Sequence, residues 1–117
     1  MPTAQAEQTI ETEQYIIHYN AFNSTFIAPE VAQANNIVRS KYSAMLNIAV
    51  MKKDANAEPK PVKALINGEV TNRLQQLQAL RFSLINEGDA VYYLTSFTFA
   101  DADTLDFTIT VQPDPNK

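Results

Sequence analysis

A run of hydrogen-bonding side chains set between aromatic residues begins at the single histidine of the chain. It reads His18-Tyr-Asn-Ala-Phe-Asn-Ser-Thr-Phe26, and Arg39-Ser40-Lys41 follows after a short gap. With acids elsewhere in the chain, His18 and Ser24 could supply the base and the nucleophile of a Ser-His-Asp triad. However, Ser24 is not in a Gly-x-Ser-x-Gly elbow, and neither of the two glycines is near it. The sequence therefore predicts no catalytic residue and favours a binding protein over a hydrolase.

The same run is a candidate binding site for a small polar ligand. Its aromatic rings, Tyr19, Phe22 and Phe26, could wall a polar groove. The planar guanidinium of Arg39 would add an anion-binding corner. The candidate ligand-binding residues are His18, Asn20, Asn23, Thr25, Arg39 and Ser40.

The alternative is a structural role for this run. Asn, Ser and Thr side chains commonly bond to backbone groups where a strand ends or a helix begins. We then expect residues 18–26 to leave the first strand and cross an end of the fold, with Phe22 and Phe26 pointing inward and Arg39 nearby. In that case Asn23→Ala destabilises the protein by about 1–3 kcal/mol, the cost of leaving a buried partner unpaired. In a functional role it would weaken binding instead.

Metal binding is not expected. The chain has no cysteine and one histidine, so a zinc site would depend almost entirely on carboxylates. Asp101, Asp103 and Asp106 place three carboxylates within six residues, and calcium favours oxygen ligands of this kind. The stretch lacks the glycine and the final acidic residue of an EF-hand, and aspartate in a β-turn is the simpler explanation. We predict neither a metal nor another cofactor.

Residues 1–12 are polar and predict a flexible tail. From Tyr15 to Phe22 aromatic and β-branched residues predict a first strand. Residues 28–34 predict a helix of about two turns, with Pro29 in its first turn and Asn35-Asn36 ending it.

The middle of the chain predicts a buried strand followed by irregular structure. Residues 44–51 are mostly apolar on both faces, which indicates a central strand. Residues 52–61 predict a polar loop. Residues 62–71 then fit either a hairpin turning at Asn67-Gly68 or one strand with a bulge. Residues 73–80 predict a bent segment that enters a strand.

The last third shows the clearest strand patterns. Turns at 86–89 and 100–103 frame a strand from Val91 to Phe99, in which Tyr92 and Tyr93 face opposite sides and one is in the core. Residues 105–111 alternate as a half-buried strand. We expect Phe107→Ala to cost about 3–5 kcal/mol. The predicted shared core is Leu46, Ile48, Val50, Leu105, Phe107, Ile109 and Val111.

Short strands separated by turns predict one all-β domain over residues 13–113. The expected fold is an immunoglobulin-like or fibronectin-like sandwich of six or seven strands with one short helix, and a small barrel is the alternative. The net charge is −4, and Lys and Arg are concentrated in residues 39–81. An acidic chain is a poor nucleic-acid binder, so no nucleic acid is expected.

Long apolar runs and a signal peptide are both missing from the sequence. We therefore expect no transmembrane segment. The polar start of the chain fits a cytosolic protein, or a mature form from which a signal peptide has been removed.

Several motifs resemble an uncharacterised proteobacterial domain family of unknown function. They are the His18–Phe26 run, Pro29, Ile37, Arg39-Ser40, Asn47-Ile48-Ala49-Val50 and Val91-Tyr92-Tyr93, and the resemblance spans about residues 13–111. It implies a small exported protein of the periplasm and supplies no catalytic residues. The function expected is a non-enzymatic binding or interaction module with a possible envelope protein partner. A small polar-ligand or anion binder is the alternative and a hydrolase a distant third, while the oligomeric state stays open.

Overall fold

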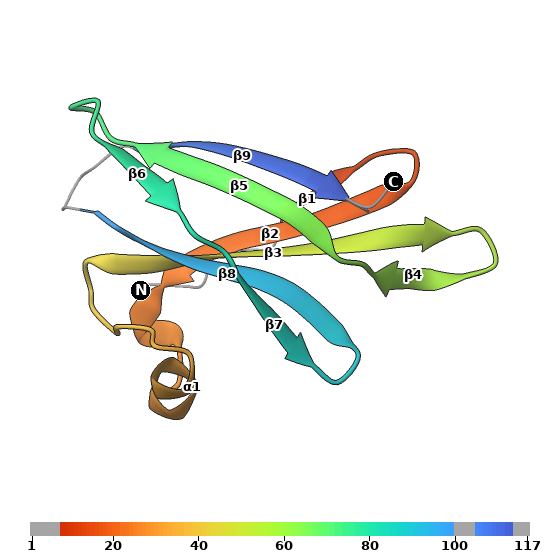
Figure 1. Ribbon diagram of the computed structural model, residues 1–117, viewed down its shortest axis with the longest axis horizontal. Coiled ribbons are helices and arrows are strands. Elements are labelled where there is room, and N and C mark those ends of the chain that lie inside the picture. The colour runs from red at the N-terminus through yellow and green to blue at the C-terminus, as the bar shows by residue number, and fades with distance from the viewer. Residues whose placement is uncertain (1–7, 100–104, 114–117) are drawn as a thin grey trace.

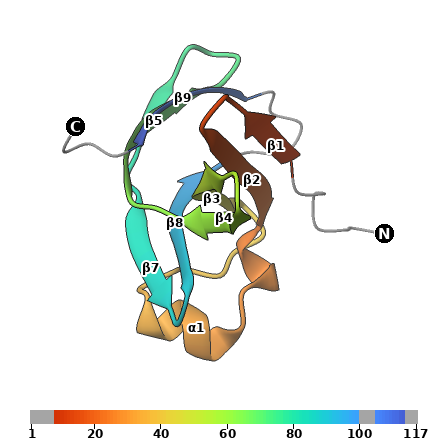
Figure 2. The same cartoon turned by 90° about the vertical axis from the view of Figure 1, so that its right-hand side faces the viewer.

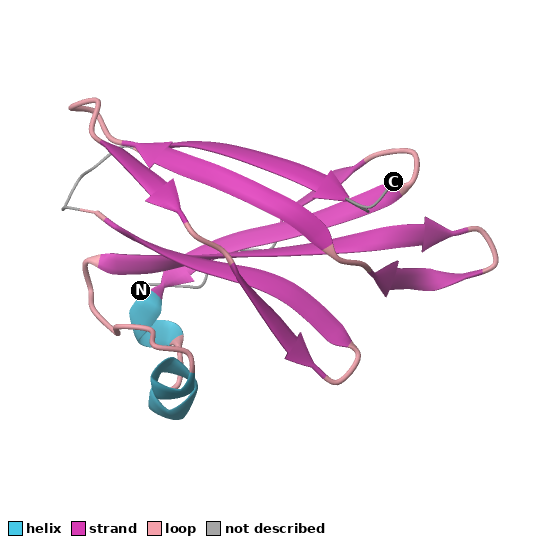
Figure 3. Cartoon of the chain, in the orientation of Figure 1, coloured by secondary structure: helices cyan, strands magenta, loops and turns pink. Residues whose placement is uncertain are grey.

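The structure, a computed structural model, describes residues 8–99 and 105–113 of the 117-residue chain (Figures 1 and 3). Within them, nine strands form two antiparallel sheets, accompanied by two short helices. The elements are β1 (Gln8–Glu11), β2 (Tyr15–Asn23), the 3₁₀ turn η1 (Ser24–Phe26), α1 (Pro29–Ala34), β3 (Ser43–Asp54), β4 (Ala57–Pro61), β5 (Ala64–Thr71), β6 (Leu77–Leu80), β7 (Ser83–Glu87), β8 (Ala90–Thr98) and β9 (Asp106–Pro113). The predicted all-β sandwich with one short α-helix is confirmed, with more strands than the six or seven expected.

The larger sheet is built around β3, in the order β1-β2-β3-β8-β7. β2 pairs with β3 over its whole length. On the other edge of β3, β8 pairs with residues 43–48 and β4 pairs with residues 51–54. β3 is central because both of its faces are largely apolar, as the sequence predicted.

The smaller sheet has the order β6-β5-β9. Asn67 and Gly68 lie inside β5, where β9 pairs with both residues in an unbroken register and β6 pairs from Gly68 onward. Of the two alternatives, the single strand is therefore confirmed, but without the bulge, and the hairpin is wrong. A β-carbon on Gly68 would come within 2.6 Å of Ile109 Cδ1, so glycine makes room for a side chain from β9.

The core lies between the facing sheets. Leu46, Ile48 and Val50 of β3 are buried in it, as predicted. Tyr93 is the buried member of the tyrosine pair, and its hydroxyl oxygen accepts the Ala64 N–H at 2.9 Å.

The predicted role of residues 105–111 needs correction. Leu105, Ile109 and Val111 are only half-buried, and Phe107 is 40% exposed. Phe107 still packs edge-on against Phe97, with 5.0 Å between the ring centroids. The alternation of β9 identified the face that turns inward, but that face is incompletely covered.

Two segments without an obvious strand pattern also pair. Residues 8–11, expected in the tail, form β1 along β2, while residues 1–7 lie outside the described part. The expected loop 52–61 is instead a hairpin, in which β3 continues to Asp54 and β4 returns. Pro59 and Pro61 are tolerated there because β4 is an edge strand with one pairing partner.

The predicted helix is confirmed as α1, with Pro29 at its start and buried Ala32 facing inward. It lies at the end of the larger sheet away from β5 and β9 (Figure 2). Of the bent segment, residues 77–80 form β6. No helix in the described part of the chain is long and apolar enough to cross a membrane.

Candidate functional site

The end of the His18–Phe26 run is held by side-chain bonds to backbone. β2 continues to Asn23, so only η1 leaves the strand. Asn23 Oδ1 accepts from the backbone N–H and the hydroxyl of Thr25, at 2.9 and 2.8 Å. Asn23 Nδ2 donates to the Lys41 carbonyl oxygen at 3.1 Å. Asn23 therefore caps η1 and ties it to the loop before β3.

Ser24 and Arg39 make the second connection to this loop. The Ser24 hydroxyl is fully buried, donates to the Ser40 carbonyl oxygen and accepts the Ser40 backbone N–H, both at 2.8 Å. Arg39, which is exposed, donates through Nη2 to the Thr25 carbonyl oxygen at 3.0 Å. Because Ser24 is inaccessible to solvent, a substrate cannot reach its hydroxyl in this conformation.

The structure thus brings together four of the six candidate ligand-binding residues, Asn23, Thr25, Arg39 and Ser40. His18 and Asn20 lie further back on β2, opposite Ala49 and Asn47 of β3. The buried Oδ1 of Asn47 has no hydrogen-bond partner among the described residues. The six candidates therefore do not form one site, and the polar groups of the cluster are engaged largely with neighbouring backbone.

One part of the predicted packing here is wrong. Phe26, expected to point inward, is 50% exposed. A 3₁₀ turn has three residues per turn, and Ser24 takes its buried position, so Phe26 falls on another side. Phe22 is half-buried opposite Met45.

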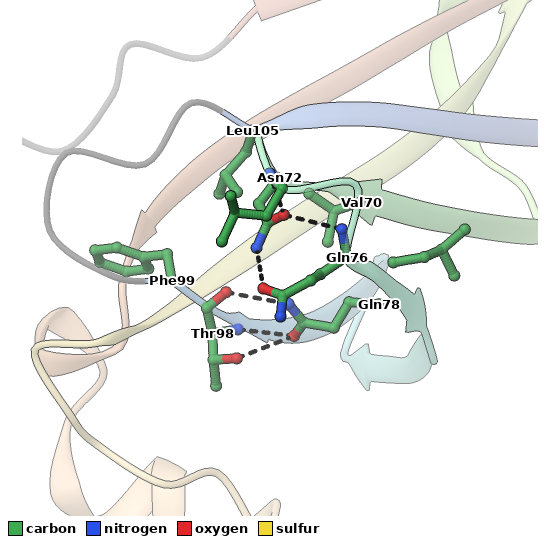
Figure 4. Close-up of a pocket in the computed structure, with 9 residues that line it drawn as sticks. Val70, Asn72, Gln76, Gln78, Thr98, Phe99 and Leu105 are labelled. Atoms are coloured by element: carbon green, nitrogen blue, oxygen red, sulfur yellow. Dashed lines mark hydrogen bonds between the residues drawn. The ribbon is translucent and has the colours of Figure 1, made fainter.

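A pocket of about 370 Å³ lies between the turn after β5 and the end of β8 (Figure 4). Its polar side chains are largely paired with one another. Gln78 donates to the Thr98 carbonyl oxygen and accepts the Thr98 backbone N–H, at 3.1 and 2.8 Å. Asn72 accepts the backbone N–H groups of Leu74 and Gln76. Gln78 thus links β6 of one sheet to β8 of the other. We therefore interpret the side chains of this pocket as a structural connection between the two sheets.

A larger groove of about 610 Å³ is lined by side chains of both sheets. Two of the strands that line it, β1 and β9, lie in the upper part of the view in Figure 2. β9 supplies Phe107, Ile109 and Val111 to one wall. The opposite wall comes from β1, β2 and β3. Its apolar side chains include Ile10, Ile17, Leu46 and Ile48.

The groove exists because the sheets differ in width. The smaller sheet has three strands and ends at β9, whereas the larger one extends past β3 to β2 and β1. The inward face of β2 is therefore only half-buried. The lining of the groove contains few polar residues. Tyr19 donates its hydroxyl to Gln8 Oε1 at 3.1 Å, and Asn20 is the remaining polar residue of the lining.

Comparison with known proteins identifies the family. The model of a domain of unknown function, DUF4426, matches residues 9–117. This chain belongs to the DUF4426 family. The chain is similar to a DUF4426 family protein from Pseudomonas aeruginosa PAO1 whose crystal structure is known, with 35% sequence identity and a TM-score of 0.80. The match covers 93% of this chain and 84% of that one. No curated protein matches the chain.

Membership in DUF4426 confirms the predicted resemblance to a proteobacterial family of unknown function. The family description states no activity, so no residue role can be transferred to this chain. Of the possible calcium ligands, Asp101 and Asp103 lie outside the described residues, and Asp106 is exposed on β9. In residues 8–99 and 105–113, no three His, Cys, Asp or Glu side chains gather closely enough to hold a metal ion.

Sequence reasoning missed the groove as a site. Part of one wall comes from β1, which was assigned to the tail, and the other wall from β9, which was assigned to a closed core. The alternation of Phe107, Ile109 and Val111 was a usable signal for the apolar face. The pattern did not indicate that the two sheets differ in width, and so it did not predict a groove between them.

Proposed function

We propose that this DUF4426 protein is a non-enzymatic binding module that holds an apolar part of its partner in the groove between β1 and β9. The observation that carries the proposal is an apolar groove of about 610 Å³ lined by both sheets. Ligand sites are typically concave and mostly apolar, with volumes of roughly 300–1,000 Å³. The groove has this size and this character.

The side chains along the groove favour binding over catalysis. Its polar residues are Gln8, Asn20 and Tyr19. Amide side chains are not general acids or bases near neutral pH, and the Tyr19 hydroxyl already donates to Gln8. The apolar walls can instead desolvate a ligand, at about 25 cal/mol for each Å² of apolar surface buried.

We place this function in the periplasm, with a protein of the cell envelope as the expected partner. The support is the resemblance to an exported family described from the sequence. Osmotic-shock fractionation of the source bacterium, followed by immunoblotting, tests the location. Recovery of the protein with cytoplasmic markers would contradict it.

Binding in the groove is tested with Nile red, a neutral fluorophore whose emission rises in apolar surroundings. Ile10→Gln makes one wall polar, and Leu65→Gln is the matched control, because the two residues are 52% and 50% exposed and Leu65 does not line the groove. We expect saturable binding that Ile10→Gln weakens about 3- to 10-fold, because the wall then offers the dye less apolar surface. Leu65→Gln should leave it unchanged. Equal effects of the two substitutions, or no saturable binding, would refute the proposal.

A further inference from the structure

Within the described residues, the outer edge of β9 is long and lacks the usual protection. β9 pairs with β5 over eight residues and ends the order β6-β5-β9, so no described strand pairs with its other edge. Exposed strand edges are normally protected by lysine, proline, bulges or short length. β4 is protected by Pro59, Lys60 and Pro61, and β1 is only four residues long. β9 contains no lysine, and its one proline is its last residue, Pro113.

The same strand forms a wall of the groove. Phe107, Ile109 and Val111 line it, while the intervening Thr108 and Thr110 are exposed. Successive side chains of a strand point to opposite faces. A peptide strand added beside β9 would therefore place every second side chain over the groove. Its backbone would meanwhile pair with the free edge, which is how added strands gain affinity and specificity together.

Hydrogen bonding and charge favour a peptide as the occupant. Glu11 and Asp106 alternate with the residues that line the groove, so their side chains lie on the outer faces of β1 and β9. Glu11 is paired with Lys53 at 2.6 Å, whereas no ion pair to Asp106 is found in the described part of the chain. An acyl chain would leave the backbone groups along the β9 edge without partners, whereas an added peptide strand pairs with them. A Lys or Arg on the outer face of that strand complements Asp106.

On the basis of the proposed function, we infer that the groove receives an extended peptide segment of a partner protein. The segment pairs with the edge of β9 that no described strand occupies, places alternate apolar side chains in the groove, and carries a basic residue on its outer face beside Asp106. This assigns β9 as the recognition strand, with Ile10 and Ile17 on the opposite wall.

The probe is a fluorescently labelled peptide, Thr-Lys-Val-Thr-Ile-Thr-Val-Lys-Thr, measured by fluorescence anisotropy, with its apolar residues on one face and its lysines on the other. Its controls are the same composition without alternation, Lys-Val-Val-Ile-Thr-Thr-Thr-Thr-Lys, and a version with Glu in place of both Lys. We expect the alternating peptide to bind at least tenfold more tightly than either control. Two further peptides carry N-methyl groups along one backbone edge or the other. One of them should lose binding and the other keep it, because only one edge faces β9.

Protein variants locate the peptide. Ile10→Gln should weaken its binding at least fivefold and Leu65→Gln should not. Asp106→Asn should weaken it about two- to fivefold at low salt, and the difference should vanish at high salt. Equal affinity for the alternating and scrambled peptides, or retained binding by both N-methylated peptides, would overturn the inference.

Two other occupants would be recognised by different results. Palmitate binding in the groove without peptide binding would identify an acyl chain and refute the peptide. A dimer observed by sedimentation and dissociated by Ile10→Gln would also refute the peptide, because the occupant of the groove would then be a second copy of the chain. Nile red binding without peptide binding would overturn only this inference and leave the apolar groove function intact.

Discussion

The Ser24 hydroxyl is a fully buried polar group that bonds twice to the backbone of Ser40. Removing it leaves a carbonyl oxygen and an N–H group without their partner, at a cost of about 1–3 kcal/mol for a buried group. We expect Ser24→Ala to lower the free energy of unfolding by this amount in urea denaturation. The exposed Thr25, whose hydroxyl bonds to Asn23, is the control, and Thr25→Ala should cost less than half as much. Equal losses would contradict a structural role centred on Ser24.

The two phenylalanines that touch at the groove should differ in their contribution to stability. Phe97 is 5% exposed, so Phe97→Ala should cost about 3–5 kcal/mol, as for buried phenylalanine. Phe107 is 40% exposed, so Phe107→Ala should cost only about 1–2 kcal/mol, because much of its ring is already in contact with solvent. Thermal and urea unfolding of both variants check the order. A larger loss for Phe107→Ala would mean that the groove is closed in solution.

At the residue scale, the sequence predicted which side chains bond to backbone better than it predicted which side chains point inward. It correctly placed Asn23 and Ser24 against loop backbone with Arg39 nearby, because short polar side chains commonly bond in this way. The Thr25 hydroxyl, expected to do the same, bonds to Asn23 instead. The sequence did not place Phe26, whose direction depends on which residue of a single helical turn is buried.

Among the elements, strands with an apolar pattern were predictable, including the edge strand β9, whereas the polar edge strands β1 and β4 were not. β3 and β8 carry apolar residues in a recognisable period. β1 and β4 are polar and gain their strand structure from pairing with β2 and β3, which no local pattern reports. β5 was ambiguous because Asn-Gly is a strong turn signal, which pairing with β9 overrides here.

Gly68 couples β5 to the groove. A β-carbon there would meet the Ile109 side chain at 2.6 Å, and Ile109 lines the groove from β9. Gly68→Ala should therefore displace Ile109 and destabilise the protein by about 1–3 kcal/mol, the usual cost of overpacking. Combining it with Ile109→Val, which shortens the colliding side chain, should restore most of the loss. Additive losses in the double variant would show that the two residues do not compete for space.

At the scale of the whole molecule, unequal sheets leave one side of the sandwich open. The sequence predicted an apolar face on β9 but not that a three-stranded sheet would leave it partly uncovered, because sheet width depends on which distant segments pair. The positive charges lie mostly in residues 39–81, and one of them, Lys53, pairs with Glu11 of β1. The open groove makes this side the distinctive surface of the molecule.

Binding is expected in the groove and not at the cluster around Asn23 and Arg39. Nuclear magnetic resonance titration of ¹⁵N-labelled protein with 1-hexanol, a neutral apolar probe, tests this most directly. We expect amide shift changes to concentrate in β1, in β2 and around Ile109 of β9, with those of Asn23 and Arg39 unmoved. Changes centred on Asn23 to Arg39, or spread evenly over the sheets, would contradict binding in the groove.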